Sequence, residues 1–558
     1  MNKRSILRIS MMLVLIGSLG FITQTAGDLF EISKNLEIFG KLYTEVNKVY
    51  VDETNPTALM RTGIDAMLAS LDPYTNFYSE SQIDLSRLIN SGQYSSIGVE
   101  VGRRGGQVVI VEVEGGGPAD AGGLLVGDAV LEVDNLVLTG SGQTLEEVRN
   151  LLMGQKGTPV RLLIQRADEP EPRSFLIERG GVTVEEENVP YAGLIQPEIG
   201  YIQLTGFMAN AGQEVATALK RCQEQSPGLR GVILDLRGNP GGRLDQAVAV
   251  SNVFIGQGEL ITEMRGRTTD SRSKFYTMLP PVDAQIPLVV LINGRSASAS
   301  EIVSGSIQDL DRGVIVGRRS FGKGLVQNVR PLESYNTQMK ITIAKYYTPS
   351  GRCIQALDYA HRQPDGSVGR IPDSLIQAFK TKNGRLVYDG GGVDPDIEVV
   401  KPAPQPISQA LKDQNLIFDF ATRYVAAHDS IAPARTFAID DATFEAFVAF
   451  VRERGFAFRT VTEQQLDALA DQLAREGYDD DSESTFAELR RKIEMQKEAD
   501  LYHHRDEIAD LLRTEIVGRY YFRAGLVEAA FDTDPDLLRA IEVLRDPVQY
   551  KALLSKQP

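Results

Sequence analysis

The chain has 558 residues, of which 42% are hydrophobic and 24% are charged, as expected of a globular protein with about three to four domains. Its 59 basic and 75 acidic side chains give a net charge of −16, which argues against a nucleic-acid partner. Two cysteines and four histidines are too few for a disulfide framework or a cysteine-type zinc site, and no HExxH motif is present.

Residues 1–27 have the composition of an export segment. Lys3 and Arg4 precede an apolar stretch whose cleaner part, residues 11–22, has the length of a signal-peptide core and is short for a membrane span. Both a cleaved signal peptide and an uncleaved anchor fit this pattern. We therefore expect the protein in the periplasm or cell envelope, held at the inner membrane if the segment stays attached.

Two different segments follow. Residues 28–95 place apolar side chains at helical spacing, and Asp72-Pro73 ends the last helix, so we expect an N-terminal helical region. Residues 96–180 contain short β-rich runs separated by glycine turns, with one helix expected over 144–153. This pattern predicts a small module built mainly of β-strands.

The remainder of the chain changes character once more. Residues 181–400 alternate apolar, β-branched runs with helical stretches, which predicts an α/β domain with buried, partly parallel strands. Residues 401–558 open with a proline-rich linker and then read as charged helices with apolar stripes. This C-terminal helical region would suit a homo-oligomer contact, an accessory protein or simple docking on the core.

A strand-to-helix turn rich in serine and alanine, residues 291–301, is the first candidate for chemistry. A serine here could be a nucleophile, although serine-rich turns more often only cap helices. Residues 181–360 hold no histidine, so the base would have to be a lysine made neutral by burial. Lys323 lies between two glycines, and Gln327, four residues on, could orient its amine from the same side of a helical turn.

A second glycine-rich turn, residues 234–242, follows another buried strand. Its free amides could face a developing oxyanion, and the alternative is an ordinary strand-to-helix turn. No GK[ST] sequence follows, which excludes a Walker A phosphate loop.

Together these segments resemble the carboxyl-terminal processing peptidases, the S41 serine peptidase family, which combine a Ser/Lys dyad with a PDZ domain. The resemblance covers about residues 35–400 and implies a multidomain α/β protein with a crotonase- or ClpP-like peptidase core over 181–400. It also implies Ser298 as the nucleophile, Lys323 as the general base and Gln327 as the residue that holds the lysine amine.

The same resemblance assigns the oxyanion hole to the amide of Ala299 and to one glycine amide, that of Gly241 or of Gly242. The family's 25-residue separation between serine and lysine selects Ser298, rather than Ser296 or Ser300, as the partner of Lys323. Phe321 stands where the family often has tyrosine, a departure that leaves the dyad intact.

The module over residues 96–180 resembles a bacterial PDZ domain. Its carboxylate-binding loop would be Ser96-Ile97-Gly98-Val99, and a peptide would add as a strand beside residues 97–101. A pocket for the last side chain of that peptide would be lined by Ile97, Val99, Leu145 and Val148.

We therefore expect an exported serine endopeptidase that cuts proteins near a free, apolar C-terminus and needs neither metal nor cofactor. Two alternatives remain open from the sequence: a catalytically silent PDZ scaffold and a crotonase-like acyl-transfer enzyme. A thiol nucleophile at Cys353 is disfavoured, because no histidine or acid stands nearby in the sequence to activate it.

Overall fold

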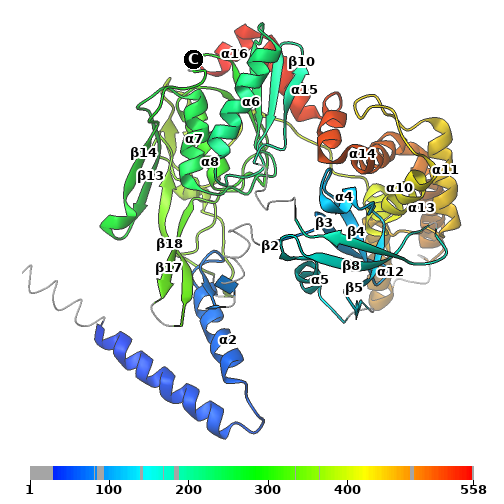
Figure 1. The fold of residues 1–558 in the computed structure, drawn as a ribbon, viewed down its shortest axis with the longest axis horizontal. Coiled ribbons are helices and arrows are strands. Elements are labelled where there is room, and N and C mark those ends of the chain that lie inside the picture. The colour runs from blue at the N-terminus through cyan, green and yellow to red at the C-terminus, as the bar shows by residue number, and fades with distance from the viewer. Residues whose placement is uncertain are drawn as a thin grey trace, which may run out of the picture. The chain divides into compact units, whose positions relative to one another are not determined.

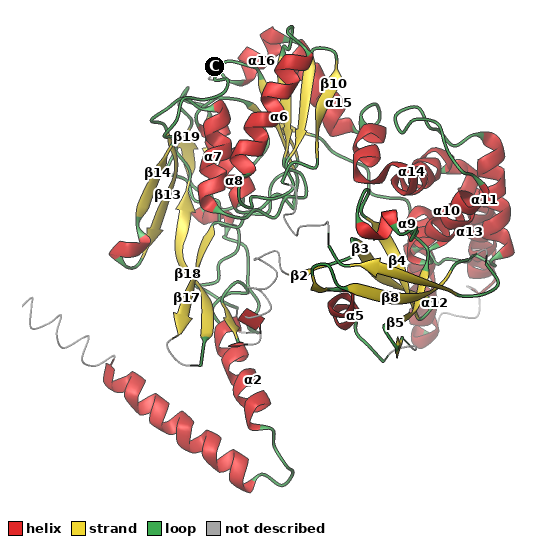
Figure 2. Cartoon of the chain, in the orientation of Figure 1, coloured by secondary structure: helices red, strands yellow, loops and turns green. Residues whose placement is uncertain are grey.

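The structure is a computed structural model (Figures 1 and 2). It describes residues 29–80, 82–83, 94–138, 142–167, 169–180, 188–332, 335–363, 365–477 and 483–555. The predicted export segment, residues 1–27, lies outside these ranges. In the part of the chain that is described, no helix has both the length and the apolar character needed to cross a membrane.

The chain divides into two compact units. The first joins Met1–Glu80 with Gln327–Thr342, and the second joins Ser81–Val326 with Ile343–Pro558. The first unit therefore takes one hairpin from within the predicted peptidase segment. The two units are described separately below.

The first unit contains the predicted N-terminal helices and one strand that the sequence analysis missed. Helix 29–49 is followed by α2 (Pro56–Ala69), which starts with proline at its first turn after an Asn55 cap. Asp72 ends the helical stretch by accepting hydrogen bonds from two backbone amides at 2.9 Å. β1 (Asn76–Tyr78) then pairs antiparallel with residues 338–340 of β18 (Thr337–Tyr347).

The second unit is built around a six-stranded sheet in the order β10-β11-β12-β15-β16-β21. Only β10 pairs antiparallel, and the other neighbours are parallel. The strands span Tyr191–Gln196, Ile199–Gln203, Gly231–Asp235, Leu288–Ile292, Val314–Gly317 and Ile397–Glu398. Because parallel strands all end at the same edge, the turns after β12 and β15 lie next to each other, and both candidate turns of the sequence analysis follow these strands.

Helices cover both faces of this sheet. Alternate strand residues such as Leu234 and Val290 pack with α6 (Ala211–Gln225), α7 (Leu244–Phe254) and α8 (Ala299–Asp309). The intervening residues, such as Ile233 and Val289, pack instead against α15 (Pro535–Arg545) from the far end of the chain. The strands are therefore buried on both sides, as expected for a parallel sheet.

Residues 94–180 form a separate small module, seen near β3, β4 and α5 in Figure 1. Its antiparallel sheet runs in the order β3-β4-β5-β8-β9, so β3 (Val99–Arg104) lies at an edge. The predicted helix is α5 (Leu145–Leu152), which begins with a capping box formed by Thr144 and Glu147. The strands β4, β5, β8 and β9 span Gln107–Val113, Ala129–Val133, Pro159–Gln165 and Arg173–Glu178, and the short β6 (Leu136–Val137) pairs with β5.

The C-terminal region is helical, as predicted, but its helices serve two different cores. One group, α9 to α14, builds its own aromatic core, for example from Phe420, Phe444 and Phe447. Their bounds are Pro406–Asp413, Leu416–Ala427, Asp441–Glu453, Val461–Glu476, Glu483–His503 and Arg505–Ala530. The last two helices, α15 and α16 (Pro547–Leu553), contribute instead to the cluster on the central sheet, where α15 packs against β12, β15 and β16 (Figure 2).

Candidate active site

The serine-rich turn leads from β15 into α8 with a strained residue at its end. Ser298 precedes the first residue of α8 and has φ 57° and ψ −111°. Positive φ is costly for any residue other than glycine and persists only where the surrounding structure holds it. Such strain is common at functional sites, and here it falls on the serine that the sequence analysis proposes as the nucleophile.

The two neighbouring serines are engaged elsewhere. The hydroxyl of Ser296 donates to the carbonyl of Leu236 at 2.8 Å, and that of Ser300 donates to the carbonyl of Asn239 at 2.9 Å. Both side chains are completely buried, whereas Ser298 retains 8% of its surface. The structure therefore favours Ser298 over its neighbours on grounds that are independent of the 25-residue spacing.

A buried carboxylate, which the sequence analysis assigned no role, ties Ser298 to Lys323. One oxygen of Glu301 accepts the backbone N–H of Ser298 at 2.8 Å and the backbone N–H of Lys323 at 2.9 Å. The two nitrogens can therefore be no further apart than the sum of these two bonds. The segments that carry the proposed nucleophile and base are brought together through one side chain.

The other oxygen of Glu301 is equally occupied. It accepts the hydroxyl of Ser320 at 2.5 Å and the backbone N–H of Gly322 at 2.6 Å. Complete burial raises the pKa of Glu301 above its usual range, and these four donors oppose that rise because they favour the ionised form. The spacing Ser298-x-x-Glu301 is a capping-box pattern, which is the sequence signal that could have drawn attention to it.

Lys323 lies in a loop ahead of β17 (Leu325–Leu332) and is half-buried. Its flanking glycines allow close packing of the backbone. A Cβ at Gly322 would lie 2.4 Å from the Cβ of Ala356, and a Cβ at Gly324 would lie 2.7 Å from the backbone nitrogen of Gln355. Larger residues at these two positions would push the lysine loop away from its support.

The prediction of a helical turn between Lys323 and Gln327 is wrong. Gln327 lies in β17, where its side-chain amide donates to Thr342 Oγ1 at 3.2 Å. Apolar, β-branched neighbours such as Val326 and Val329 favour an extended chain here, and pairing with β18 fixes it. The proposed role of Gln327 in holding the lysine amine stays a prediction.

The glycine turn after β12 packs directly against the nucleophile turn. A Cβ at Gly241 would lie 2.9 Å from both the backbone nitrogen of Ala299 and the Cβ of Ser298, so only glycine fits. The amide of Gly241 donates to Asn239 Oδ1 at 2.9 Å, whereas the structure gives the amides of Ala299 and Gly242 no acceptor among the described residues. Of the two glycines that the sequence analysis left open, this geometry favours Gly242.

The PDZ-like module presents the expected edge for a peptide. β3 is an edge strand, and Arg149 of α5 reaches across to it, 3.2 Å from Glu100 Oε2. The hydroxyl of Ser96 accepts the amide of Gly98, which has φ 80°. The module's core contains the completely buried Ile97 and Val148, against which Val99 and Leu145 pack with partial exposure. The assignment of these four residues to a peptide pocket stays a prediction.

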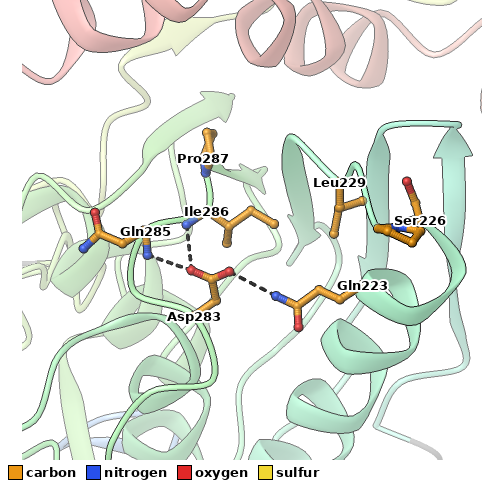
Figure 3. Close-up of a pocket in the computed structure, with 8 residues that line it drawn as sticks. Gln223, Ser226, Leu229, Asp283, Gln285, Ile286 and Pro287 are labelled. Carbon is orange, nitrogen blue, oxygen red and sulfur yellow. Dashed lines mark hydrogen bonds between the residues drawn. The ribbon is translucent and has the colours of Figure 1, made fainter.

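A pocket of about 440 Å³ lies away from this chemistry (Figure 3). Leu229 and Pro287 line it, and they precede β12 and β15, whereas the two candidate turns follow these strands. Asp283 in this pocket accepts the amides of Gln285 and Ile286 and the side-chain amide of Gln223. Its position at the opposite end of the sheet separates it from Ser298.

Neither cysteine has the surroundings of a nucleophile. Burial raises the pKa of the Cys222 thiol and that of the Cys353 thiol, which keeps both protonated and unreactive. Among the residues that the structure describes, no cluster of three or more histidine, cysteine or acidic side chains could hold a metal ion.

Three family profiles match successive stretches of the chain. A PDZ domain matches residues 109–166, peptidase family S41 matches 198–368, and a family described as "Probable PDZ-protease, C-terminal helical domain" matches 407–544. A "Carboxy-terminal-processing protease" of Bartonella bacilliformis is 36% identical over 346 residues, which make up 62% of this chain and 75% of the relative. The chain belongs to peptidase family S41.

Two other similar proteins share less identity with this chain. The "Carboxy-terminal processing protease CtpA" of Bacillus subtilis is 30% identical over 317 residues, covering 56% of this chain and 65% of the relative. A solved structure of a photosystem II D1 C-terminal processing protease is 26% identical, covers 65% of this chain and 92% of its own, and gives a TM-score of 0.35. The expected S41 serine peptidase with a PDZ domain and a C-terminal helical domain is thus confirmed.

Proposed function

We propose that this S41 peptidase is an exported endopeptidase that processes protein substrates near their C-termini, with Ser298 as nucleophile and Lys323 as general base. The observation that carries the assignment is the single Glu301 oxygen that accepts both backbone amides. The names of the relatives from Bartonella bacilliformis and Bacillus subtilis support the C-terminal specificity.

The proposed reaction has two halves. The neutral amine of Lys323 takes the hydroxyl proton of Ser298 as Oγ attacks the peptide carbonyl carbon. The resulting oxyanion is stabilised by the N–H groups of Ala299 and Gly242, at about 3–4 kcal/mol per donor. The C–N bond then breaks, Lys323 protonates the leaving amine, and a water activated by the same lysine hydrolyses the acyl-enzyme.

The PDZ domain would select the substrate. The free carboxylate of an apolar tail would be held by the loop amides of residues 96–99, and the tail would pair with the open edge of β3. A protein with an unfolded or flexible C-terminal tail is therefore the substrate class we propose.

The test compares the full-length chain with Ser298→Ala and Lys323→Ala on an unfolded protein that ends in apolar residues, with fragments identified by mass spectrometry. We expect cleavage by the wild type and none by either variant. Ser350→Ala and Lys345→Ala, in residues outside the proposed dyad, serve as matched controls and should cleave normally. If Ser298→Ala or Lys323→Ala cleaves the substrate at the wild-type rate, the assignment of the Ser/Lys dyad is contradicted.

Two further arms test specificity and location. Amidation of the substrate's C-terminus should slow cleavage if the PDZ loop binds a carboxylate, and an unchanged rate would contradict that step. Residues 1–27 fused to a reporter that is active only outside the cytoplasm should give activity, and a silent fusion would contradict export.

A further inference from the structure

A mostly buried arginine lies between strand β12 and the glycine turn of the proposed oxyanion hole. Arg237 donates from Nε and Nη2 to the carboxylate of Asp235, at 2.6–3.1 Å. Its remaining nitrogen, Nη1, reaches the other end of the chain, where it donates to Asp534 at 2.6 Å and to Asp536 at 2.8 Å. The residue that follows, Gly238, begins the glycine turn itself.

The two distant carboxylates belong to the start of α15, which covers one face of the central sheet. Asp534 caps α15 by accepting the backbone N–H of Asp536 at 2.9 Å. Lys401 also contacts Asp534 at 3.1 Å and Asp536 at 3.0 Å. Burial raises the pKa of Asp534, but the charges of Arg237 and Lys401 outweigh it and hold that pKa below its usual range.

This cluster has little exposure to solvent, so its contacts are costly to break. The side chains of Asp536 and Asp235 are 3% and 4% exposed, and that of Arg237 is 15% exposed. Removing one member leaves the opposite charge buried without full compensation. The carboxylates of α15 therefore contribute to the conformation that Arg237 adopts.

On its other side, the glycine turn is held by hydrogen bonds to the nucleophile turn. The carbonyl of Asn239 accepts the backbone N–H of Ala297 at 3.0 Å and the hydroxyl of Ser300 at 2.9 Å, both from the nucleophile turn. The side chain of Asn239 bridges Leu204 and Gly241. Arg237 is thus the anchor that joins this turn to the C-terminal helices.

We propose that Asp534 and Asp536 are positioning residues for catalysis, because they hold Arg237 and thereby fix the turn that presents the amide of Gly242. Donors in an oxyanion hole act only when they are already aimed at the developing charge, and a displacement of 1 Å can cost about 100-fold in rate. This inference rests on the proposed roles of Ser298, Ala299 and Gly242.

The test measures kcat and KM of the full-length chain carrying Asp534→Asn, Asp536→Asn or both. We expect kcat to fall about 10- to 100-fold, since the donor is displaced and not removed, while KM changes less than about two-fold. The affinity for a peptide aldehyde, which forms a tetrahedral adduct with the nucleophilic serine, should fall by the same factor as kcat. A purely structural defect would lower the active fraction without changing that affinity.

Asp532→Asn is the matched control. Asp532 lies two residues earlier in the same turn, but it pairs with Arg435 and its side chain is 52% exposed. It should keep the wild-type kcat. Asp534 is more exposed than Asp536, so Asp534→Asn keeps the test decisive if Asp536→Asn does not fold.

The outcomes distinguish a failure of the positioning role from a failure of the proposed peptidase mechanism. If Ser298→Ala is inactive but folded Asp534→Asn has wild-type kcat and aldehyde affinity, the positioning role is overturned and the proposed peptidase mechanism stands. If Ser298→Ala cleaves normally, the proposed nucleophile itself is wrong, whatever the aspartate variants do.

Discussion

At the scale of single residues, the site depends on a carboxylate that does no proposed chemistry itself. Glu301 accepts four hydrogen bonds, two of them from the backbone of the proposed nucleophile and base. A buried carboxylate of this kind stabilises the fold only while its oxygens accept a hydrogen bond from every donor that faces them. Its loss should therefore reduce both stability and activity.

Glu301→Gln tests this. The glutamine has the same shape, but its amide nitrogen cannot accept, so two donors lose their partner at about 1–3 kcal/mol each. We expect a lower melting temperature and a kcat/KM reduced at least ten-fold. Glu263→Gln, in a surface pair with Arg265, is the control. A Glu301→Gln protein that melts and cleaves like the wild type would refute the role.

The contact between the two turns predicts a second residue-scale effect. In Gly241→Ala the new methyl group would collide with the backbone of Ala299 and with Ser298, so we expect activity to fall by 100-fold or more. Gly258→Ala is the matched control, because Gly258 also has positive φ and open space around its Cβ position but lies outside both turns. Both variants carry similar backbone strain, about 1–2 kcal/mol, and only the first should lose most activity. Equal activities would contradict the proposed arrangement.

Among single residues, the sequence predicted best those that belong to a motif with a fixed spacing. The family resemblance selected Ser298 through its separation from Lys323, and the structure favours it because its backbone is strained and its neighbours Ser296 and Ser300 are more deeply buried. Glu301 is the last residue of the same serine-rich segment, but the sequence analysis gives it no role, because a glutamate three positions after a serine usually only completes a helix cap. Its contacts with Ser320 and Gly322 come from a separate loop and could not be predicted locally.

At the scale of elements, regular runs were predicted well and their partners were not. α5 lies within the predicted span 144–153, and β15 and β5 coincide with apolar runs of the sequence. A helical turn was expected between Lys323 and Gln327, yet Gln327 lies in strand β17 because β18 offers a hairpin partner. Local periodicity does not report which distant segment completes a sheet or covers its face.

A prediction at the scale of elements concerns the packing of helix α15 against the central sheet. Leu537 is 1% exposed in the cluster on the central sheet, whereas the adjacent Leu538 is 42% exposed. Leu537→Ala should destabilise the protein by about 2–5 kcal/mol, measured by chemical denaturation, because it leaves a cavity against the sheet. Leu538→Ala should cost much less. Equal effects would show that α15 does not contribute to the peptidase core.

At the scale of the second unit as a whole, the PDZ domain is held by the C-terminal helices. Phe418 of α10 packs with Val109 and Ala129 of the PDZ sheet. Arg519 of α14 lies over the Phe418 ring at 4.4 Å and donates to the carbonyl of Val126 at 3.2 Å. This contact joins the PDZ domain to the C-terminal helical domain, a link that no motif in the sequence revealed.

Arg519→Met should loosen this contact. Arg519 is 4% exposed and makes charge-assisted bonds worth about 1.5–3 kcal/mol each, so we expect faster amide hydrogen exchange over residues 109–130. Arg523→Met removes an exposed pair with Glu112 at the same contact and should change exchange little. If both variants exchange like the wild type, the contact does not hold the PDZ domain.

The central claim, that Ser298 is a nucleophile activated by Lys323, is tested most directly by covalent labelling. The full-length chain would be treated with a fluorophosphonate, digested, and analysed by mass spectrometry to locate the modified residue. The account predicts labelling of Ser298 alone, at a rate that falls steeply in Lys323→Ala and substantially in Glu301→Gln. Labelling of a different serine, or a wild-type labelling rate in Lys323→Ala, would contradict it.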